Sequence, residues 1–78
     1  MTPRIESAEY LESHRIRLIF ADGKTRIIDL EDELWGEMFE PLKNLETFQQ
    51  FKVNPELRTI VWPNGADLAP EFLYETAA

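Results

Sequence analysis

The sequence contains no cysteine, so disulfide bonds and thiolate metal sites are excluded. It has one histidine, His14, which leaves too few ligands for the usual zinc-binding sets. No apolar run approaches the roughly 20 residues of a membrane-spanning helix, and no secretory signal is recognisable. Glycine is also scarce, and its three positions are scattered rather than gathered in a phosphate-binding loop. These absences predict a cytoplasmic protein without a cofactor, a metal or a membrane contact.

Bases are scarce relative to acids, with 8 Lys and Arg against 15 Asp and Glu and a net charge of −7. Nucleic-acid binding begins with neutralising phosphates, so direct binding of DNA or RNA is not expected. The charge is uneven, because residues 29–40 include six acids and no base. A solvated surface is the ordinary interpretation of such a stretch, and an acidic face for a basic partner is the alternative.

The chain has 78 residues, which predicts a single domain over residues 1–78. A chain of this length buries only about 60–65% of the surface that its unfolded form exposes. The core therefore depends on large side chains, and five Phe, two Trp and two Tyr supply them together with Leu and Ile.

A β-hairpin is the clearest local signal. Residues 15–20 alternate in hydrophobicity, Asp22-Gly23 predicts a turn, and residues 25–29 return antiparallel. With Phe20 opposite Thr25, one face of the hairpin would be the core face and the other would be partly covered. The predicted core face holds Ile16, Leu18, Phe20, Thr25 and Ile27, and the second face holds Arg15, Arg17, Ile19, Arg26 and Ile28.

The other segments complete a fold of mixed class. Residues 5–10 and 57–62 are predicted strands, and residues 30–40 are predicted to form one or two short helical turns that end at Pro41. Asn44 is predicted to cap a helix over residues 45–52, and Asp67 to cap a last helix that runs through Pro70 to residue 76. We therefore expect an α+β fold, a small mixed or mostly antiparallel sheet of about four strands with two to three short helices on one face.

No catalytic constellation is recognisable. Ser13 and His14 are neighbours, and adjacent side chains in an extended segment point to opposite faces, so they are not a nucleophile and its base. His14 is expected to be a solvated turn residue. We therefore predict that the chain is not an enzyme, and we assign no catalytic, cofactor-binding or metal-binding residue.

Three groups of residues are candidates for protein–protein contacts. Trp35 and Phe39, together with Met38, stand among acids; burial in the core is the favoured interpretation, and an exposed partner anchor is the alternative. Trp62, Asn64 and Asp67 belong to a tight Trp-Pro-Asn-Gly-Ala-Asp turn, interpreted as structural or as a recognition loop. Arg15 and Arg17 lie on the second face of the hairpin.

Three stretches give the chain a resemblance to a family. Residues 15–29, residues 34–43 and the run of residues 59–68 around Trp62 are similar to the small bacterial domain-of-unknown-function family number 2442, and the resemblance covers nearly the whole chain. It implies an α+β fold, no settled activity, and a frequent second small protein encoded alongside, as in a toxin–antitoxin-like pair. Some members carry an added helix-turn-helix domain, which is not expected here because the sequence stops at Ala78, just past the last predicted helix.

Three functional hypotheses follow. The first is a non-catalytic protein-interaction domain, one form of which is the antitoxin-like partner of a two-gene pair. The second is a self-associating domain that dimerises through the face of Arg15, Arg17, Ile19 and Ile28. A small-ligand binder or an enzyme is the third and least favoured.

Overall fold

The computed structural model describes residues 3–77. Within that range the chain forms a three-stranded antiparallel sheet, a two-stranded antiparallel sheet and four short helical segments. The first sheet holds β1 (Ile5–Glu12), β2 (Arg15–Phe20) and β3 (Thr25–Asp29) in that order, and the second pairs β4 (Lys52–Val53) with β5 (Ile60–Val61). The helical segments are the 3₁₀ turns η1 (Glu31–Glu33) and η2 (Glu40–Lys43) and the α-helices α1 (Leu45–Phe48) and α2 (Pro70–Thr76).

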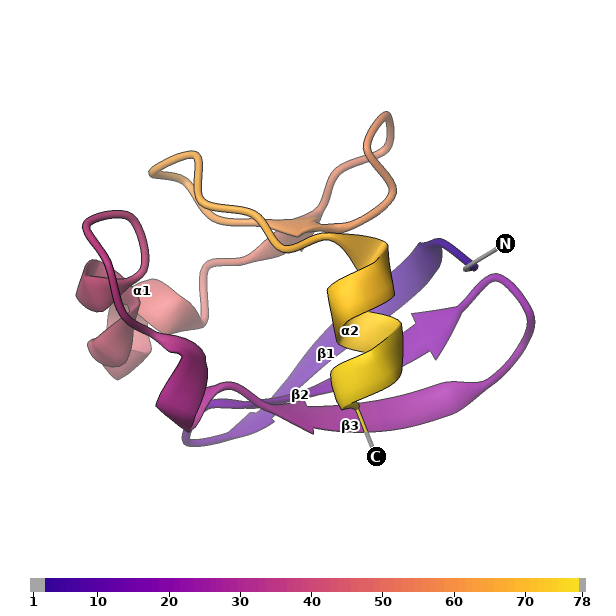
Figure 1. Ribbon diagram of the computed structural model, residues 1–78, viewed down its shortest axis with the longest axis horizontal. Coiled ribbons are helices and arrows are strands. Elements are labelled where there is room, and N and C mark those ends of the chain that lie inside the picture. Colours follow the sequence, from indigo (N-terminus) through magenta and orange to yellow (C-terminus); the bar gives the residue numbers. More distant parts are fainter. Residues whose placement is uncertain (1–2, 78) are drawn as a thin grey trace.

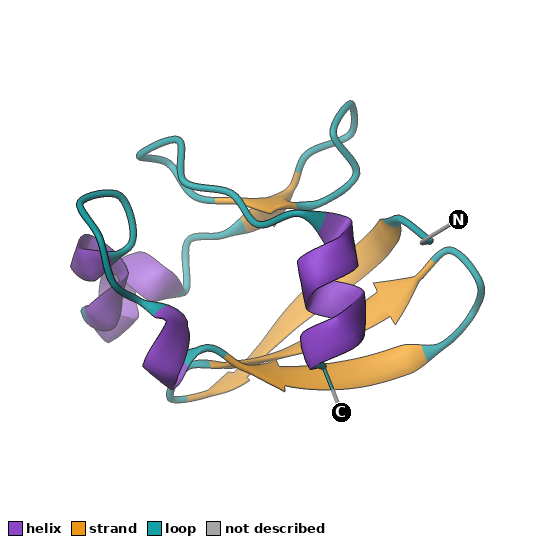
Figure 2. Cartoon of the chain, viewed as in Figure 1, coloured by secondary structure: helices purple, strands orange, loops and turns teal. Residues whose placement is uncertain are grey.

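The elements form two layers. The three-stranded sheet is one layer, and the β4–β5 pair, the loops around it and all the helical segments gather over one of its faces (Figure 1). Long loops connect the elements of this second layer (Figure 2). The α+β class and the helices on one face are confirmed, although the strands of residues 3–77 divide between two sheets.

The core lies between the two layers. Ile16, Leu18 and Ile28 point into it from the three-stranded sheet, and Phe48 and Trp62 meet them from the other side. The Trp62 indole packs against the rings of Phe48, Phe51 and Phe39, at centroid distances of 5.8, 6.3 and 6.4 Å. Aromatic side chains thus supply much of the buried surface in a domain too small for a large aliphatic core.

The hairpin forms where it was predicted, but its register differs by one residue. Thr25 pairs with Ile19 rather than with Phe20, and Phe20 instead hydrogen-bonds to Lys24, its N–H donating to the Lys24 carbonyl over 2.9 Å. The loop is therefore the three residues 21–23, closed by Gly23 N–H donating to the Phe20 carbonyl. Gly23 has a φ of +86°, the left-handed conformation that ends such three-residue loops.

The register decides which isoleucine of β3 is buried. Ile28 pairs with Ile16 and is 1% exposed, whereas Ile27 pairs with Arg17 and is 46% exposed. The predicted core face is wrong for Thr25 and Ile27, and the predicted second face is wrong for Arg26 and Ile28. A shift of one residue reverses every side chain of a strand, because side chains alternate between faces.

Pro41, in the segment before α1, lies at the start of a helical turn and not, as was predicted, at the end of one. It stands in the first turn of η2, where its missing N–H leaves no hydrogen bond unmade. Asn44 caps α1 as predicted: its Oδ1 accepts from the N–H groups of Glu46 and Thr47, at 2.9 and 3.3 Å. The helix ends at Phe48, however, and Lys52 belongs to β4 rather than to the predicted helix.

Replacing Asn44 with alanine should therefore lower the free energy of unfolding by about 1 kcal/mol, the usual cost of losing an N-cap. Urea denaturation followed by circular dichroism measures the change. Asn44→Asp, which keeps an acceptor oxygen, should cost much less. A loss for Asn44→Asp as large as for Asn44→Ala would mean that the cap does not stabilise α1.

The last third of the chain is less regular than predicted. Of the predicted strand over residues 57–62 only Ile60 and Val61 are paired, because Arg58 takes a φ of +58° that no strand continues. Asp67 does not cap the last helix but forms an isolated bridge with Val61. The helix begins at Pro70 with Ala69 in the N-cap position, whose extended backbone is the conformation favoured before proline.

Candidate interaction surface

Trp35 is exposed because of how the chain passes through residues 30–40. Leu30 and Leu34 are buried on either side of η1 and anchor this loop to the core. Gly36, with a φ of +89°, then turns the chain, and its carbonyl accepts the N–H groups of Phe39 and Glu40 at 3.2 and 2.9 Å. Trp35 is left 72% exposed between the anchor and the turn. The core interpretation favoured from the sequence is therefore wrong for Trp35.

An apolar groove lies beside the exposed indole. Glu33, Trp35, Phe39, Leu68 and Phe72 line it, and its volume is about 230 Å³. Trp35 and Phe39 come from the loop after η1, Leu68 from the segment before α2, and Phe72 from α2 itself. We call this feature the Trp35 groove. Its walls are apolar apart from Glu33, so it suits an apolar side chain rather than a charged ligand.

The Trp-Pro-Asn-Gly turn contacts the loop that carries Trp35 and Phe39. Asn64 donates from Nδ2 to the Met38 carbonyl at 2.9 Å, and its Oδ1 accepts from the N–H of Ala66 at 3.0 Å. Trp62 is 2% exposed, packs edge-on against Phe39, and donates from Nε1 to the Phe48 carbonyl at 2.9 Å. The two features that the sequence analysis treated separately are therefore one structural unit, in which Trp62 and Asn64 hold the loop that carries Trp35.

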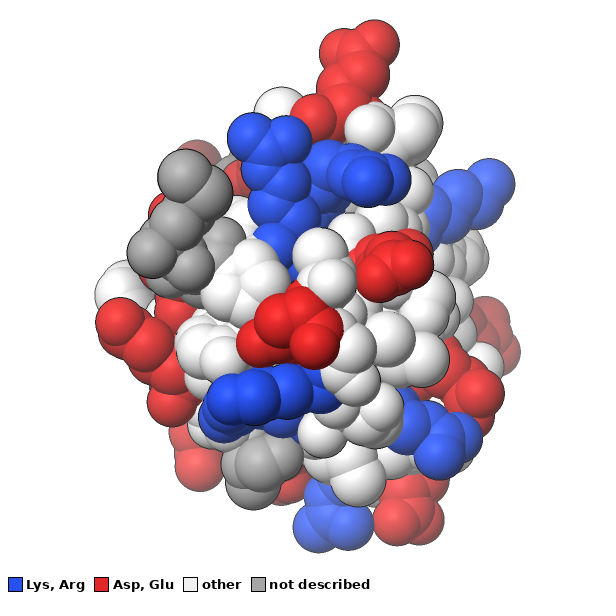
Figure 3. All heavy atoms as spheres, turned by 90° about the vertical axis from the view of Figure 1, so that its right-hand side faces the viewer, with Lys and Arg blue, Asp and Glu red and all other residues white. Residues whose placement is uncertain are grey.

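The segment that carries Trp35 is acidic. Residues 29–40 include six acids and no base, and all of these acids are exposed except Glu33, which is half-buried in the groove wall. On the right-hand side of Figure 1, Lys and Arg side chains lie among the acids (Figure 3). The acidic loop lies at the left of Figure 1, away from those bases. An apolar groove with one carboxylate in its wall, formed in part by an acidic segment, is complementary to an apolar side chain with basic neighbours.

Asp29 stands at the start of the acidic stretch and is held in its charged form. The Glu31 N–H donates to its carboxylate at 3.0 Å, which lowers the pKa of Asp29, and Arg15 at 3.3 Å lowers it further. At the hairpin turn the Lys24 N–H lowers the pKa of Asp22 in the same way, with help from the Tyr74 hydroxyl. Each carboxylate accepts a backbone N–H from two residues further along the chain and so stabilises a turn, which is a structural role.

Comparison with known proteins places the chain in a family. Residues 5–78 match the model of DUF2442, a family of proteins of unknown function. The chain belongs to the DUF2442 family. No curated protein and no solved structure matches it. The resemblance stated from the residues is thereby confirmed, and the family contributes no catalytic or binding residue to the description of this DUF2442 chain.

The remaining predicted site residues of this DUF2442 protein lie away from the Trp35 groove. Arg15 and Arg17 lie on the face of the three-stranded sheet that no element covers within residues 3–77, and each forms ion pairs there: Arg15 with Glu12 and Asp29, at 3.3 Å in both cases, and Arg17 with Glu9. Asp67 is exposed in its bridge with Val61. Leu68 and Phe72 were not predicted as site residues, and both are half-buried and line the groove.

His14 has a structural role in this DUF2442 domain. It lies in the turn between β1 and β2, as predicted, but it is half-buried rather than solvated. Its ring packs edge-on against Phe48 at 4.8 Å, and its Nε2 donates to the Lys43 carbonyl at 3.2 Å. These contacts join the sheet to the segment between η2 and α1.

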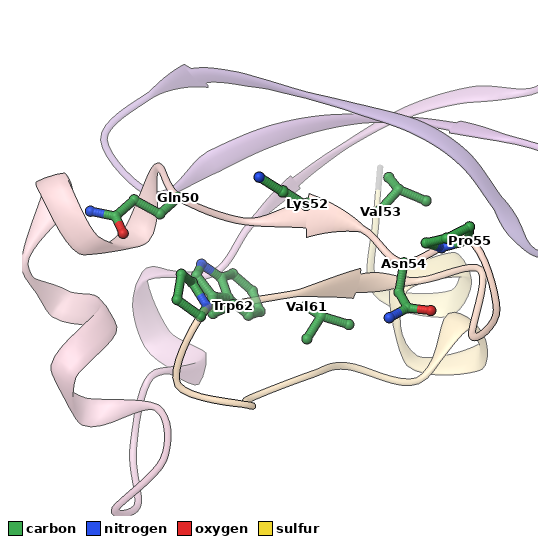
Figure 4. A pocket seen from close by; sticks show the side chains of 8 residues that line it. Gln50, Lys52, Val53, Asn54, Pro55, Val61 and Trp62 are labelled. Atoms are coloured by element: carbon green, nitrogen blue, oxygen red, sulfur yellow. The ribbon is translucent and has the colours of Figure 1, made fainter.

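A second, wider hollow of about 400 Å³ lies along the β4–β5 pair (Figure 4). Lys52 is the one titratable residue among those that line it, and Asn54 uses its Oδ1 to accept from the N–H groups of Glu56 and Leu57. The hollow therefore presents no pair of groups for acid–base catalysis. Within residues 3–77 there is also no cluster of three potential metal ligands and no helix long and apolar enough to cross a membrane.

Proposed function

We propose that this DUF2442 chain is a non-catalytic protein-interaction domain of the bacterial cytoplasm, which binds an apolar, basic segment of a partner protein in the Trp35 groove. The observation that carries the proposal is the 72% exposure of Trp35 beside a preformed apolar groove. Tryptophan is enriched among the residues that contribute most to the free energy of binding. A small domain that leaves a tryptophan this exposed gives up the stabilisation that burying its apolar surface would provide.

Three further observations support a macromolecular partner. Met38, three residues after Trp35 in the same loop, is 47% exposed and is a second exposed apolar side chain of this loop. The loop is braced by Asn64 and Phe39, so Trp35 is presented by a segment whose backbone is already ordered, which reduces the entropy lost on binding. The acids of residues 29–40 favour a basic partner and would speed its association. An antitoxin-like role in a two-gene pair is one function that such a surface would serve.

Self-association, the second function predicted from the sequence, would use a different surface. Ile27 is 46% exposed on edge strand β3 of the three-stranded sheet, where it takes the place that was predicted for Ile28. The two functions are compatible, since the Trp35 groove lies in the other layer.

The Trp35→Ala substitution tests the interaction. We expect it to abolish recovery of the partner when tagged protein is used as bait in the host at physiological salt, and to weaken binding of the purified partner by about 30-fold or more, the effect of losing a dominant anchor. Isothermal titration calorimetry measures the loss. Binding should also weaken with rising salt, because the acids of residues 29–40 other than Glu33 are exposed.

Leu57→Ala is the matched control, since Leu57 is 55% exposed in a loop outside the groove. It should bind the partner as the native chain does. Recovery of bait alone from the host, or a partner held equally well by Trp35→Ala, would overturn the proposal.

A further inference from the structure

The two edges of the three-stranded sheet differ in how they are protected. β1 has register shifts near both ends, between Ile5 and Ser7 and between Tyr10 and Glu12, and β4 lies alongside it. Such bulges and covering segments prevent an edge strand from pairing with another chain. β3 pairs with β2 in an unbroken register. α2 contacts β3 as well, but on the core face, where Tyr74 packs against Arg26, and within residues 3–77 the β3 backbone hydrogen-bonds to no element other than β2. The edge of β3 is therefore the one open to pairing.

The hydrogen-bond pattern shows which groups β3 presents. Leu30 N–H donates to the His14 carbonyl and Phe20 N–H to the Lys24 carbonyl, so these pairs are hydrogen-bonded pairs of the β2–β3 ladder. Bonded and non-bonded pairs alternate in an antiparallel ladder. It follows that Thr25, Ile27 and Asp29 direct their backbone N–H and C=O groups away from β2, toward the open edge.

We propose that two copies of this chain dimerise by antiparallel pairing of β3 with β3, with the two-fold axis at Ile27, so that the two sheets become one. In that register each outward N–H and C=O of the strand meets one from the second copy. Ile27 meets Ile27 of the second copy, and Thr25 lies opposite its Asp29, a hydroxyl opposite a carboxylate. A shift that placed the axis at Asp29 would instead set two like charges opposite each other, which is unfavourable.

The charges of the sheet favour this edge pairing over face-to-face packing. The uncovered face carries the ion pairs of Arg17 with Glu9 and of Arg15 with Glu12 and Asp29, all of them exposed. Packing two such faces together would remove these charges from water, and the desolvation penalty can exceed the Coulomb gain. Edge pairing leaves the ion pairs solvated and brings together the exposed Ile27 side chains. The second copy is thus accommodated without use of the Trp35 groove.

Sedimentation equilibrium of the native chain over micromolar to millimolar concentrations tests the proposal, and we expect a dimer. Ile27→Lys should be monomeric, because the two lysines would lie opposite each other at the axis. Ile19→Lys is the matched control: Ile19 is similarly exposed on the same face, but it lies on the central strand and should leave the dimer intact. Both lysine variants should keep the native circular dichroism spectrum, since neither side chain is buried.

A mixture of Ile27→Lys and Ile27→Glu should restore the dimer that each variant lacks alone, since the axis at Ile27 places the new charges opposite each other. A native chain that stays monomeric at millimolar concentration would overturn the proposal. So would a dimer that survives Ile27→Lys, or one that Ile19→Lys disrupts equally, since the last result belongs to face-to-face packing.

Discussion

Replacing Trp62 with alanine should lower the free energy of unfolding by about 3–5 kcal/mol, whereas the same replacement at Trp35 should lower it by less than about 1 kcal/mol. Trp62 is 2% exposed and touches three phenylalanine rings, so its removal leaves a cavity that the core fills only in part. The Phe48 carbonyl would also lose the indole N–H that donates to it. Trp35 leaves no cavity, since most of its side chain is in water.

Urea denaturation of the two variants, followed by circular dichroism, measures the difference. A domain of this size has a free energy of unfolding of only about 4–12 kcal/mol, so Trp62→Ala can be unfolded without denaturant. Trp62→Phe, which keeps an aromatic ring but not the N–H, should fold with a smaller loss and serves as the measurable variant. Equal losses for the alanine variants would show that the two tryptophans do not differ in burial.

The second large effect concerns the register of the hairpin. Ile28→Ala should lower the free energy of unfolding by about 2–5 kcal/mol, and Ile27→Ala by about 1 kcal/mol or less. The residues are adjacent and identical in type, so only the face on which each lies distinguishes them: Ile28 is 1% exposed and Ile27 46%. A low protein concentration keeps self-association from contributing to the measured stability.

The reverse order, with Ile27→Ala the more costly, would show that Phe20 pairs with Thr25 as the sequence analysis predicted. Ile28→Val provides a graded control, because removing one methylene from the same site should cost about 0.5–1.5 kcal/mol. A loss that does not grow from valine to alanine would mean that Ile28 is not packed in the core.

The sequence by itself determined the features that depend on neighbouring residues. Asp22-Gly23 placed the hairpin turn because glycine accepts the positive φ without a steric penalty. Asn44 predicted a cap because its short side chain reaches the N–H groups two and three residues ahead. The α+β class followed from the change of hydrophobic period along the chain, and the stretch around Trp62 indicated the DUF2442 family.

The tertiary structure decided the features that depend on distant residues. The Asp-Gly turn signal allows more than one hairpin loop length, and the loop length sets the register of the two strands. In the structure the loop has three residues, and this register buries Ile28 rather than Ile27 in the core. The β4 strand was not predicted, and Lys52 was assigned to the end of the predicted helix instead. A strand of two residues has no hydrophobic period, and it is defined only by its pairing with β5.

Trp35 shows the same division at the candidate site. Its spacing from Leu30 and Leu34 suited a helix that would have buried it, but Gly36 ends that geometry and the core positions are occupied by the two leucines. The groove then needs Leu68 and Phe72, more than 30 residues away along the chain, and the Asn64 hydrogen bond to Met38 that braces the loop. Such a surface arises from packing between segments, for which local sequence patterns carry no signal, because residues distant in the chain meet only after the core has formed.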